Sequence, residues 1–124
     1  MKTAKQFLDE ANAAVPRITS EEGIAKHGEG GVVFVDVRDS ADIAKTGTIP
    51  GALRISRGFI EFAADDATPY HNPAMKKDAD LVLVCGAGGQ AALAGKTLKE
   101  MGYTSVVNVG GIGDWEKAGG ALEK

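Results

Sequence analysis

The chain has one cysteine, Cys85, and the residues around it could make its thiol reactive. Cys85 ends the apolar run of residues 81–84 and is followed by the loop GAGGQ, residues 86–90. Small residues let successive backbone N–H groups turn toward one point and form an anion-binding nest at the start of a helix. Such a nest favours a thiolate or a persulfide anion, so Cys85 is a candidate nucleophile. The position equally suits a small buried hydrophobic residue, and spacing alone leaves both interpretations open.

The same stretch also resembles two phosphate-binding motifs. Gly86, Gly88 and Ala91 fit the dinucleotide pattern G-x-G-x-x-A, but this match is weak because the next strand, VVNVGG, lacks the acidic residue that binds ribose. The GKT at residues 95–97 resembles the end of a P-loop. That motif needs a glycine where Gln90 stands, and the GKT falls inside a predicted helix, whose amides are already bonded. The P-loop is therefore rejected.

Composition limits the remaining possibilities. The 124 residues suit one domain, and 44% hydrophobic with 25% charged residues is typical of a globular protein. A net charge of −3 without a basic stripe gives no reason to expect nucleic acid. No signal peptide or membrane-spanning segment is visible. One cysteine and two histidines exclude an internal disulfide and a structural zinc cluster. We therefore expect a cytoplasmic protein without metal or cofactor.

Apolar periodicity predicts an alternation of strands and helices. This order is typical of an open α/β sheet, whose chemistry lies at the carboxyl ends of the strands, where Cys85 stands. Ile18 is expected in a further short strand, Thr19 or Ser20 at the start of a helix, and Trp115 in a short buried closing helix. Residues 64–80 are expected to be irregular. The predicted strands are residues 32–37, 53–56, 81–84 and 106–109, and the main helices about 3–14, 40–45, 58–64 and 89–101.

Several motifs in the expected order resemble the rhodanese, or sulfurtransferase, family. The run VVFVDVRDSADIAKTGTIPGALRIS resembles the family's strand, Asp-Val-Arg, short helix and Ile-Pro-Gly-Ala turn. The run VLVCGAGGQAALAGKTLKEMGYTSVVNVGGIGDW resembles its cysteine loop, following helix, last strand and Gly-Gly…Trp ending. The resemblance implies an open five-stranded parallel sheet with helices on both faces. Residues 18–124 would form this domain, and residues 1–17 a helical extension.

The resemblance also implies a chemistry. Cys85 would carry sulfane sulfur as a persulfide, taken from thiosulfate or a persulfide donor and passed to cyanide or a thiol. A protein could serve as donor or acceptor, and no cofactor is implied. The backbone amides of the loop would stabilise the thiolate and the terminal sulfur. The implied loop residues are Gly86, Ala87, Gly88, Gly89 and Gln90.

The loop departs from the family pattern in its charge. Gly86 and Gln90 stand where the family often has arginine, so the loop contains no cation for a dianion such as thiosulfate. Arg57 is the candidate outside the loop that would supply one. Asp36 is expected to anchor the sheet edge near the site, and Arg38 to form a structural ion pair.

Further residues bear on the alternatives. Related phosphatases need an arginine at the position of Ala91 to hold a tetrahedral oxyanion, so phosphatase activity is not expected. Thr48 replaces a histidine that supports the Ile-Pro-Gly-Ala turn, with little expected catalytic effect. His71 is expected to be a solvated loop residue. Two alternatives to a sulfurtransferase stay open: a rhodanese-like binding module without turnover, and a persulfide sensor or carrier.

Overall fold

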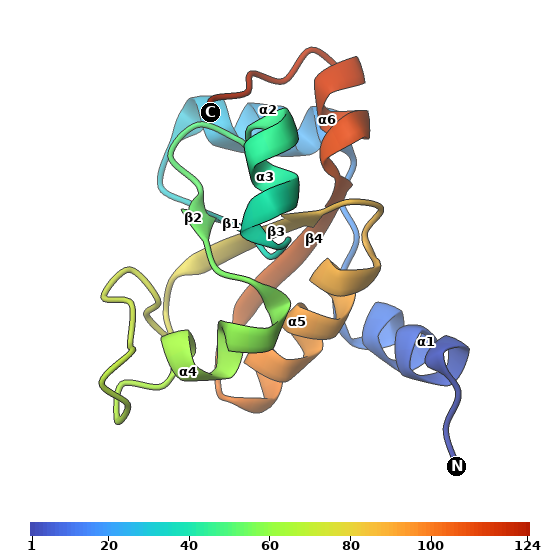
Figure 1. Ribbon diagram of the computed structural model, residues 1–124, viewed down its shortest axis with the longest axis vertical. Coiled ribbons are helices and arrows are strands. Elements are labelled where there is room, and N and C mark those ends of the chain that lie inside the picture. The colour runs from blue at the N-terminus through green and yellow to red at the C-terminus, as the bar shows by residue number, and fades with distance from the viewer.

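A four-stranded parallel sheet forms the centre of the molecule (Figure 1). The computed structural model describes all residues, 1–124. The strands lie in the order β2-β1-β3-β4. The two strands with the most buried residues, β3 and β4, are therefore neighbours, and β3 is interior. Their bounds are β1 Val33–Asp36, β2 Leu53–Arg54, β3 Asp80–Cys85 and β4 Ser105–Gly111.

Helices cover both faces of the sheet, as predicted (Figure 1). Alternate residues of each strand point to opposite faces. Val35, Leu83 and Cys85 face the larger core cluster under α4 and α5, whereas Phe34 and Val82 face the smaller cluster under α2 and α6. The helices are α1 Ala4–Ala14, α2 Ser20–Glu29, α3 Ser40–Thr46, α4 Ile60–Ala64, α5 Gly89–Glu100 and α6 Ile112–Lys117, with a 3₁₀ turn, η1, at Arg57–Phe59.

Capping boxes begin the first two helices. The Thr3 hydroxyl accepts from the Gln6 N–H while the Gln6 side chain accepts from the Thr3 N–H, and Thr19 and Glu22 form the same pair of bonds at α2. Each box satisfies two N–H groups that a helix start otherwise leaves free. The predicted start of α2 at Thr19 is therefore confirmed, and Gly30, with a φ of 78°, ends it.

The predicted five-strand count is wrong. The segment expected to hold the fifth strand makes one bridge to β4, at Arg17 and Asn108. The Ile18 N–H donates to the Asn108 carbonyl, and the Asn108 N–H donates to the Pro16 carbonyl. Pro16 has no N–H to extend this ladder, and Thr19 already caps α2. The pairing is therefore confined to the residue between them. β2 is also shorter than expected, at two residues.

The long segment between α4 and β3, residues 65–79, contains no helix or strand, as predicted. Its two ends are tied by Tyr103, whose hydroxyl donates to the carbonyls of Ala64 (2.7 Å) and Met75 (3.1 Å). Burial raises the pKa of the Tyr103 phenol above its ordinary value. Trp115 in α6 is buried, also as predicted. None of the helices combines the length and the apolar character that crossing a membrane requires.

Candidate active site

Cys85 is the last residue of β3 and is covered by the loop that follows it. Its exposed fraction is 1%. The Gly88 N–H donates to Sγ at 3.0 Å, and the Ala91 N–H donates to the same atom at 3.3 Å. Two backbone donors thus converge on one sulfur atom. The nucleophile interpretation requires such donors, and the loop supplies them.

Gly88 gives the loop its turn. Its φ of 103° lies in the left-handed region, which side chains with a Cβ rarely adopt. The residue is the N-cap of α5, so the donors to Sγ are the free N–H groups of a helix start. We call residues 86–91 with their two Sγ bonds the cradle.

Asn108 of β4 holds the cradle by a side-chain hydrogen bond, and sequence reasoning missed this role. Its side-chain amide donates to the Gly88 carbonyl (2.9 Å), and its side-chain oxygen accepts from the Gly110 N–H (2.8 Å). The side chain is 1% exposed. A polar residue inside the apolar strand VVNVGG is the sequence signal that could have found it, because a buried amide must be hydrogen-bonded.

Arg17 lies against the outside of the cradle, and sequence reasoning missed it too. Its Nη1 lies 2.8 Å from the position that a Cβ on Gly88 would take, and its Nη2 lies 2.4 Å from the equivalent position on Gly110. The absence of side chains at these two glycines therefore makes room for the guanidinium. The cradle itself contains no charged side chain.

Arg57 does not contact the cradle through any hydrogen bond. Its guanidinium donates to the Glu61 carboxylate (3.3 Å) and to the Thr97 hydroxyl (3.1 Å), which lies two turns along α5. The i, i+4 pair with Glu61 occupies its charge. The guanidinium is thus bonded to Glu61 and Thr97, and its role in anion binding stays a prediction.

Asp36 and Arg38 form a buried ion pair at the carboxyl end of β1. The Arg38 guanidinium donates to the Asp36 carboxylate (2.7 Å), to the Thr46 hydroxyl and to the Gly47 carbonyl. Thr48 also donates to Asp36, at 2.7 Å. The pair fixes the turn after α3 next to the end of β1, and the hydroxyl of Thr48 takes part in this support.

The other predicted residues lie around the cradle or away from it. Gly86, Ala87 and Gln90 are exposed, and Gly89 packs against Leu8 of α1. His71 is half-buried rather than fully solvated, with Nε2 3.0 Å from the Met75 carbonyl. No group of His, Cys, Asp and Glu side chains is arranged to hold a metal ion.

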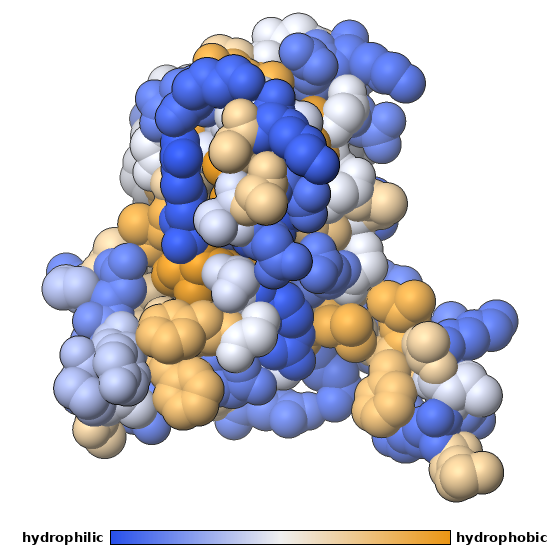
Figure 2. Space-filling view, viewed as in Figure 1, coloured by the Kyte–Doolittle hydropathy of each residue, from blue (hydrophilic) through white to orange (hydrophobic).

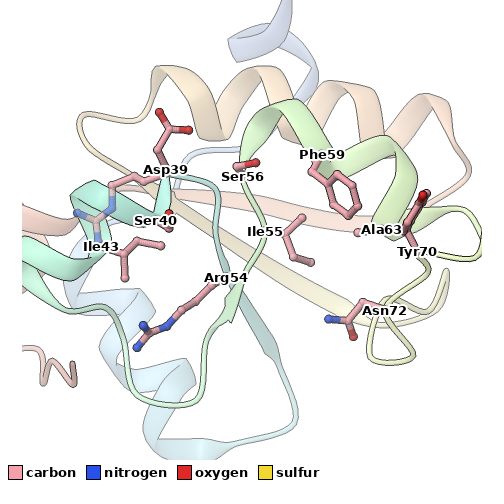
Figure 3. Close-up of a pocket in the computed structure, with 11 residues that line it drawn as sticks. Asp39, Ser40, Ile43, Arg54, Ile55, Ser56, Phe59, Ala63, Tyr70 and Asn72 are labelled. Carbon is pink, nitrogen blue, oxygen red and sulfur yellow. The ribbon is translucent and has the colours of Figure 1, made fainter.

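A separate cavity of about 460 Å³ opens between α3 and α4 over β2 (Figure 3). Its floor includes Ile43, Ile55 and Ala63, and its rim includes Arg54 and Tyr70. Figure 2 shows apolar surface over α4 beside it. Cys85 and the cradle do not line this cavity. A reaction at Sγ therefore depends on the cradle, although the cavity lies at the same edge of the sheet.

Comparisons with known proteins show which family the chain resembles. The model of the rhodanese-like domain matches residues 19–118. A sulfurtransferase from Allochromatium vinosum is 35% identical over 89 residues, which make up 71% of this chain and 75% of that protein. A structure from Rhodopseudomonas palustris, described as a protein of unknown function and possible tyrosine phosphatase, is 40% identical. It matches with a TM-score of 0.93 over 99% of this chain and 96% of that one.

The human single-domain sulfurtransferase is 27% identical and matches with a TM-score of 0.70, over 83% of this chain and 96% of that one. The parallel α/β sheet and the cysteine loop thus define a rhodanese-like fold. The chain belongs to the rhodanese-like domain family, which the sequence motifs predicted.

Proposed function

We propose that the protein is a sulfurtransferase that carries sulfane sulfur on Cys85. The observation that supports this most directly is the pair of N–H groups that converge on Sγ. In the proposed reaction these N–H groups donate to the sulfur anion, first to the thiolate and then to the persulfide.

The reaction has two steps. In the first, the Sγ thiolate attacks the sulfane sulfur of thiosulfate, a new S–S bond forms, and sulfite leaves with the electron pair of the broken bond. In the second, cyanide or a thiolate attacks the outer sulfur of the Cys85 persulfide, which releases thiocyanate or a new persulfide and regenerates the thiolate. A persulfide donor enters by the same first step, with a thiolate as leaving group.

Cys85 is the only cysteine, so no second thiol of the chain can resolve the persulfide. Sulfur must therefore pass directly to an acceptor outside the chain, a small thiol, cyanide or a partner protein. We place this activity in the cytoplasm, because the thiol must stay reduced to accept sulfur.

Sγ is covered, so a donor must first displace part of the loop. Gly86 and Ala87 are exposed, and a Cβ on Gly86 would meet no atom within 4 Å. This end of the loop has room to move, whereas Gly88 is fixed by Asn108. We propose that the donor enters past Gly86 and Ala87.

A phosphatase is the second candidate, because the similar structure from Rhodopseudomonas palustris is described as a possible one. A cysteine phosphatase needs a guanidinium to hold the phosphoryl oxygens, at the position of Ala91. Ala91 is fully buried and contributes only its N–H to Sγ. The geometry therefore favours sulfur transfer over phosphate ester hydrolysis.

Parallel assays distinguish the candidates. The parent and Cys85→Ser are tested for thiocyanate formation from thiosulfate or a persulfide donor plus cyanide, and for hydrolysis of an aryl phosphate. We expect thiocyanate from the parent alone and no phosphate release from either. Phosphate release that needs Cys85 would support the phosphatase, and inactivity in both assays would favour a binding module.

A further inference from the structure

We propose that Arg17 binds the anionic group of the sulfur donor, in place of the arginines that the cradle lacks. This proposal rests on the proposed function, since it assigns a specificity residue to the same site. Three observations on Arg17 support it: its free guanidinium, its position against the cradle and its distance from Sγ.

Arg17 is the only one of the four arginines whose guanidinium makes no hydrogen bond within the chain. Arg38 is paired with Asp36, Arg54 donates to the carbonyl of Lys124, and Arg57 donates to Glu61 and Thr97. Arg17 has no carboxylate within ion-pair distance and is exposed. Its charge and its donors are thus available to a ligand.

Two glycines make room for this free guanidinium. Gly88 and Gly110 both have a φ in the left-handed region, and a Cβ on either would lie within 3 Å of a guanidinium nitrogen. The backbone of Arg17 is also fixed, because the residues on both sides of it are hydrogen-bonded to Asn108. Arg17 and the cradle are therefore attached to the same residue of β4.

The guanidinium is close enough to act on an anion at Sγ. The Gly88 N–H donates to Sγ at 3.0 Å, and Nη1 of Arg17 lies 2.8 Å from the Cβ position of Gly88. With ordinary bond lengths, these distances place Nη1 within about 9 Å of Sγ. This is about one Debye length at physiological ionic strength.

The chemistry of a guanidinium suits this donor class. Its planar N–H groups bind sulfonate or carboxylate oxygens in pairs. Arg17 also lies two residues before the part of the chain that matches the family model, residues 19–118. The cation is therefore supplied by the junction with the N-terminal helix.

The test measures the electrostatic potential at Cys85 without requiring sulfur transfer. Cys85 is modified at low salt by an anionic and by a cationic methanethiosulfonate of similar size, and the ratio of the two rates is followed by intact mass. Arg17→Gln removes the charge but keeps a long polar side chain, Arg17→Lys keeps the charge, and Arg54→Ala is the control arginine. We expect the anionic-to-cationic ratio to fall at least about fivefold in Arg17→Gln, and to stay near the parent value in Arg17→Lys and Arg54→Ala.

A second measurement gives the rate at which thiosulfate loads sulfur onto Cys85 in the same four proteins. We expect a loss of about tenfold or more in Arg17→Gln, partial recovery in Arg17→Lys because the paired donors are missing, and no change in Arg54→Ala. An unchanged rate ratio in Arg17→Gln would overturn the proposal, even if the parent loads sulfur. The ratio could instead fall in Arg17→Gln while the parent never loads sulfur. That result would reject the sulfurtransferase and retain Arg17 as the cation of an anion site.

Discussion

At the scale of single residues, the cradle depends on one glycine conformation and one buried amide. Gly88 supplies both the left-handed turn and an N–H to Sγ, and its carbonyl is held by Asn108. Neighbouring Gly86 has neither constraint, since its φ is not positive and its Cβ position is open. The glycines of the loop are therefore not equivalent, although the sequence GAGGQ does not distinguish them.

We predict opposite outcomes for alanine at these two glycines. Gly88→Ala forces a Cβ into the left-handed region and against the Arg17 guanidinium, and it should lower the free energy of unfolding by about 1–3 kcal/mol. Gly86→Ala should change it by no more than about 0.5 kcal/mol. Urea denaturation measures both, and equal stability of the two variants would contradict the assigned backbone geometry.

Asn108→Ala should damage both stability and reactivity. The change leaves the Gly88 carbonyl and the Gly110 N–H without partners in a buried place, which should cost about 1–3 kcal/mol. The rate of sulfur loading on Cys85 should fall as well, because the Gly88 N–H is no longer fixed toward Sγ. Asn72→Ala is the control, since the Asn72 side chain bonds only within its own turn, where it accepts from the Ala74 N–H. Loading by Asn108→Ala at the parent rate would show that the amide does not position the cradle.

At the scale of elements, the carboxyl end of β1 is joined to the turn after α3 by a buried ion pair. Asp36 accepts from Arg38 and from Thr48, and none of these three side chains is exposed by more than 5%. A buried charge pair adds little net stability over an apolar pair, but removing one partner leaves the other charge without compensation.

Arg38→Met should therefore destabilise the fold by about 3–5 kcal/mol, because the Asp36 carboxylate stays buried without its cation. Arg54→Ala, on the neighbouring strand, removes an exposed guanidinium and should cost less than about 0.5 kcal/mol. Thermal unfolding of the two variants at neutral pH makes the comparison. A loss below about 1 kcal/mol in Arg38→Met would mean that Asp36 is solvated.

The elements also show what sequence can predict. β1, β3 and α5 were predictable, because continuous apolar runs and helical periodicity identify buried strands and amphipathic helices. The predicted fifth strand is absent, because Pro16 and the α2 cap limit the pairing with β4 to one bridge. Ile18 alone suggests a strand, and only its flanking residues Pro16 and Thr19, both visible in the sequence, limit the pairing to one bridge.

The same limit applies to the site. The nest around Cys85 could be predicted from the sequence of its own loop. The position of Arg17 could not, because its guanidinium lies against Gly88 and Gly110, which are far from it in sequence. Arg57 bonds to Glu61 and Thr97 rather than to the cradle, and its i, i+4 spacing to Glu61 was a visible sign of that ion pair.

At the scale of the whole molecule, the buried phenol of Tyr103 ties down the long segment between α4 and β3. Tyr103 joins Ala64 to Met75, and its pKa is raised by burial. A phenol whose pKa is higher in the folded than in the unfolded state stabilises the fold below its unfolded pKa, about 10. This contribution is lost as the pH rises through the folded value.

Tyr103→Phe should therefore cost about 1 kcal/mol at neutral pH through its lost hydrogen bonds, and should reduce the fall in stability above about pH 10. Tyr70→Phe is the control, because Tyr70 is 61% exposed. Urea denaturation from pH 7 to 11 follows both variants. If the free energy of unfolding falls with rising pH as steeply in Tyr103→Phe as in the parent, Tyr103 is not the cause of the alkaline loss of stability.

The central claim is that Cys85 carries sulfur, and intact-protein mass tests it most directly. The parent and Cys85→Ala are incubated with thiosulfate, and separately with a persulfide donor, and then with cyanide. We predict that the parent alone gains one sulfur atom and loses it as thiocyanate forms. No gain with either donor, or an equal gain in Cys85→Ala, would contradict the claim.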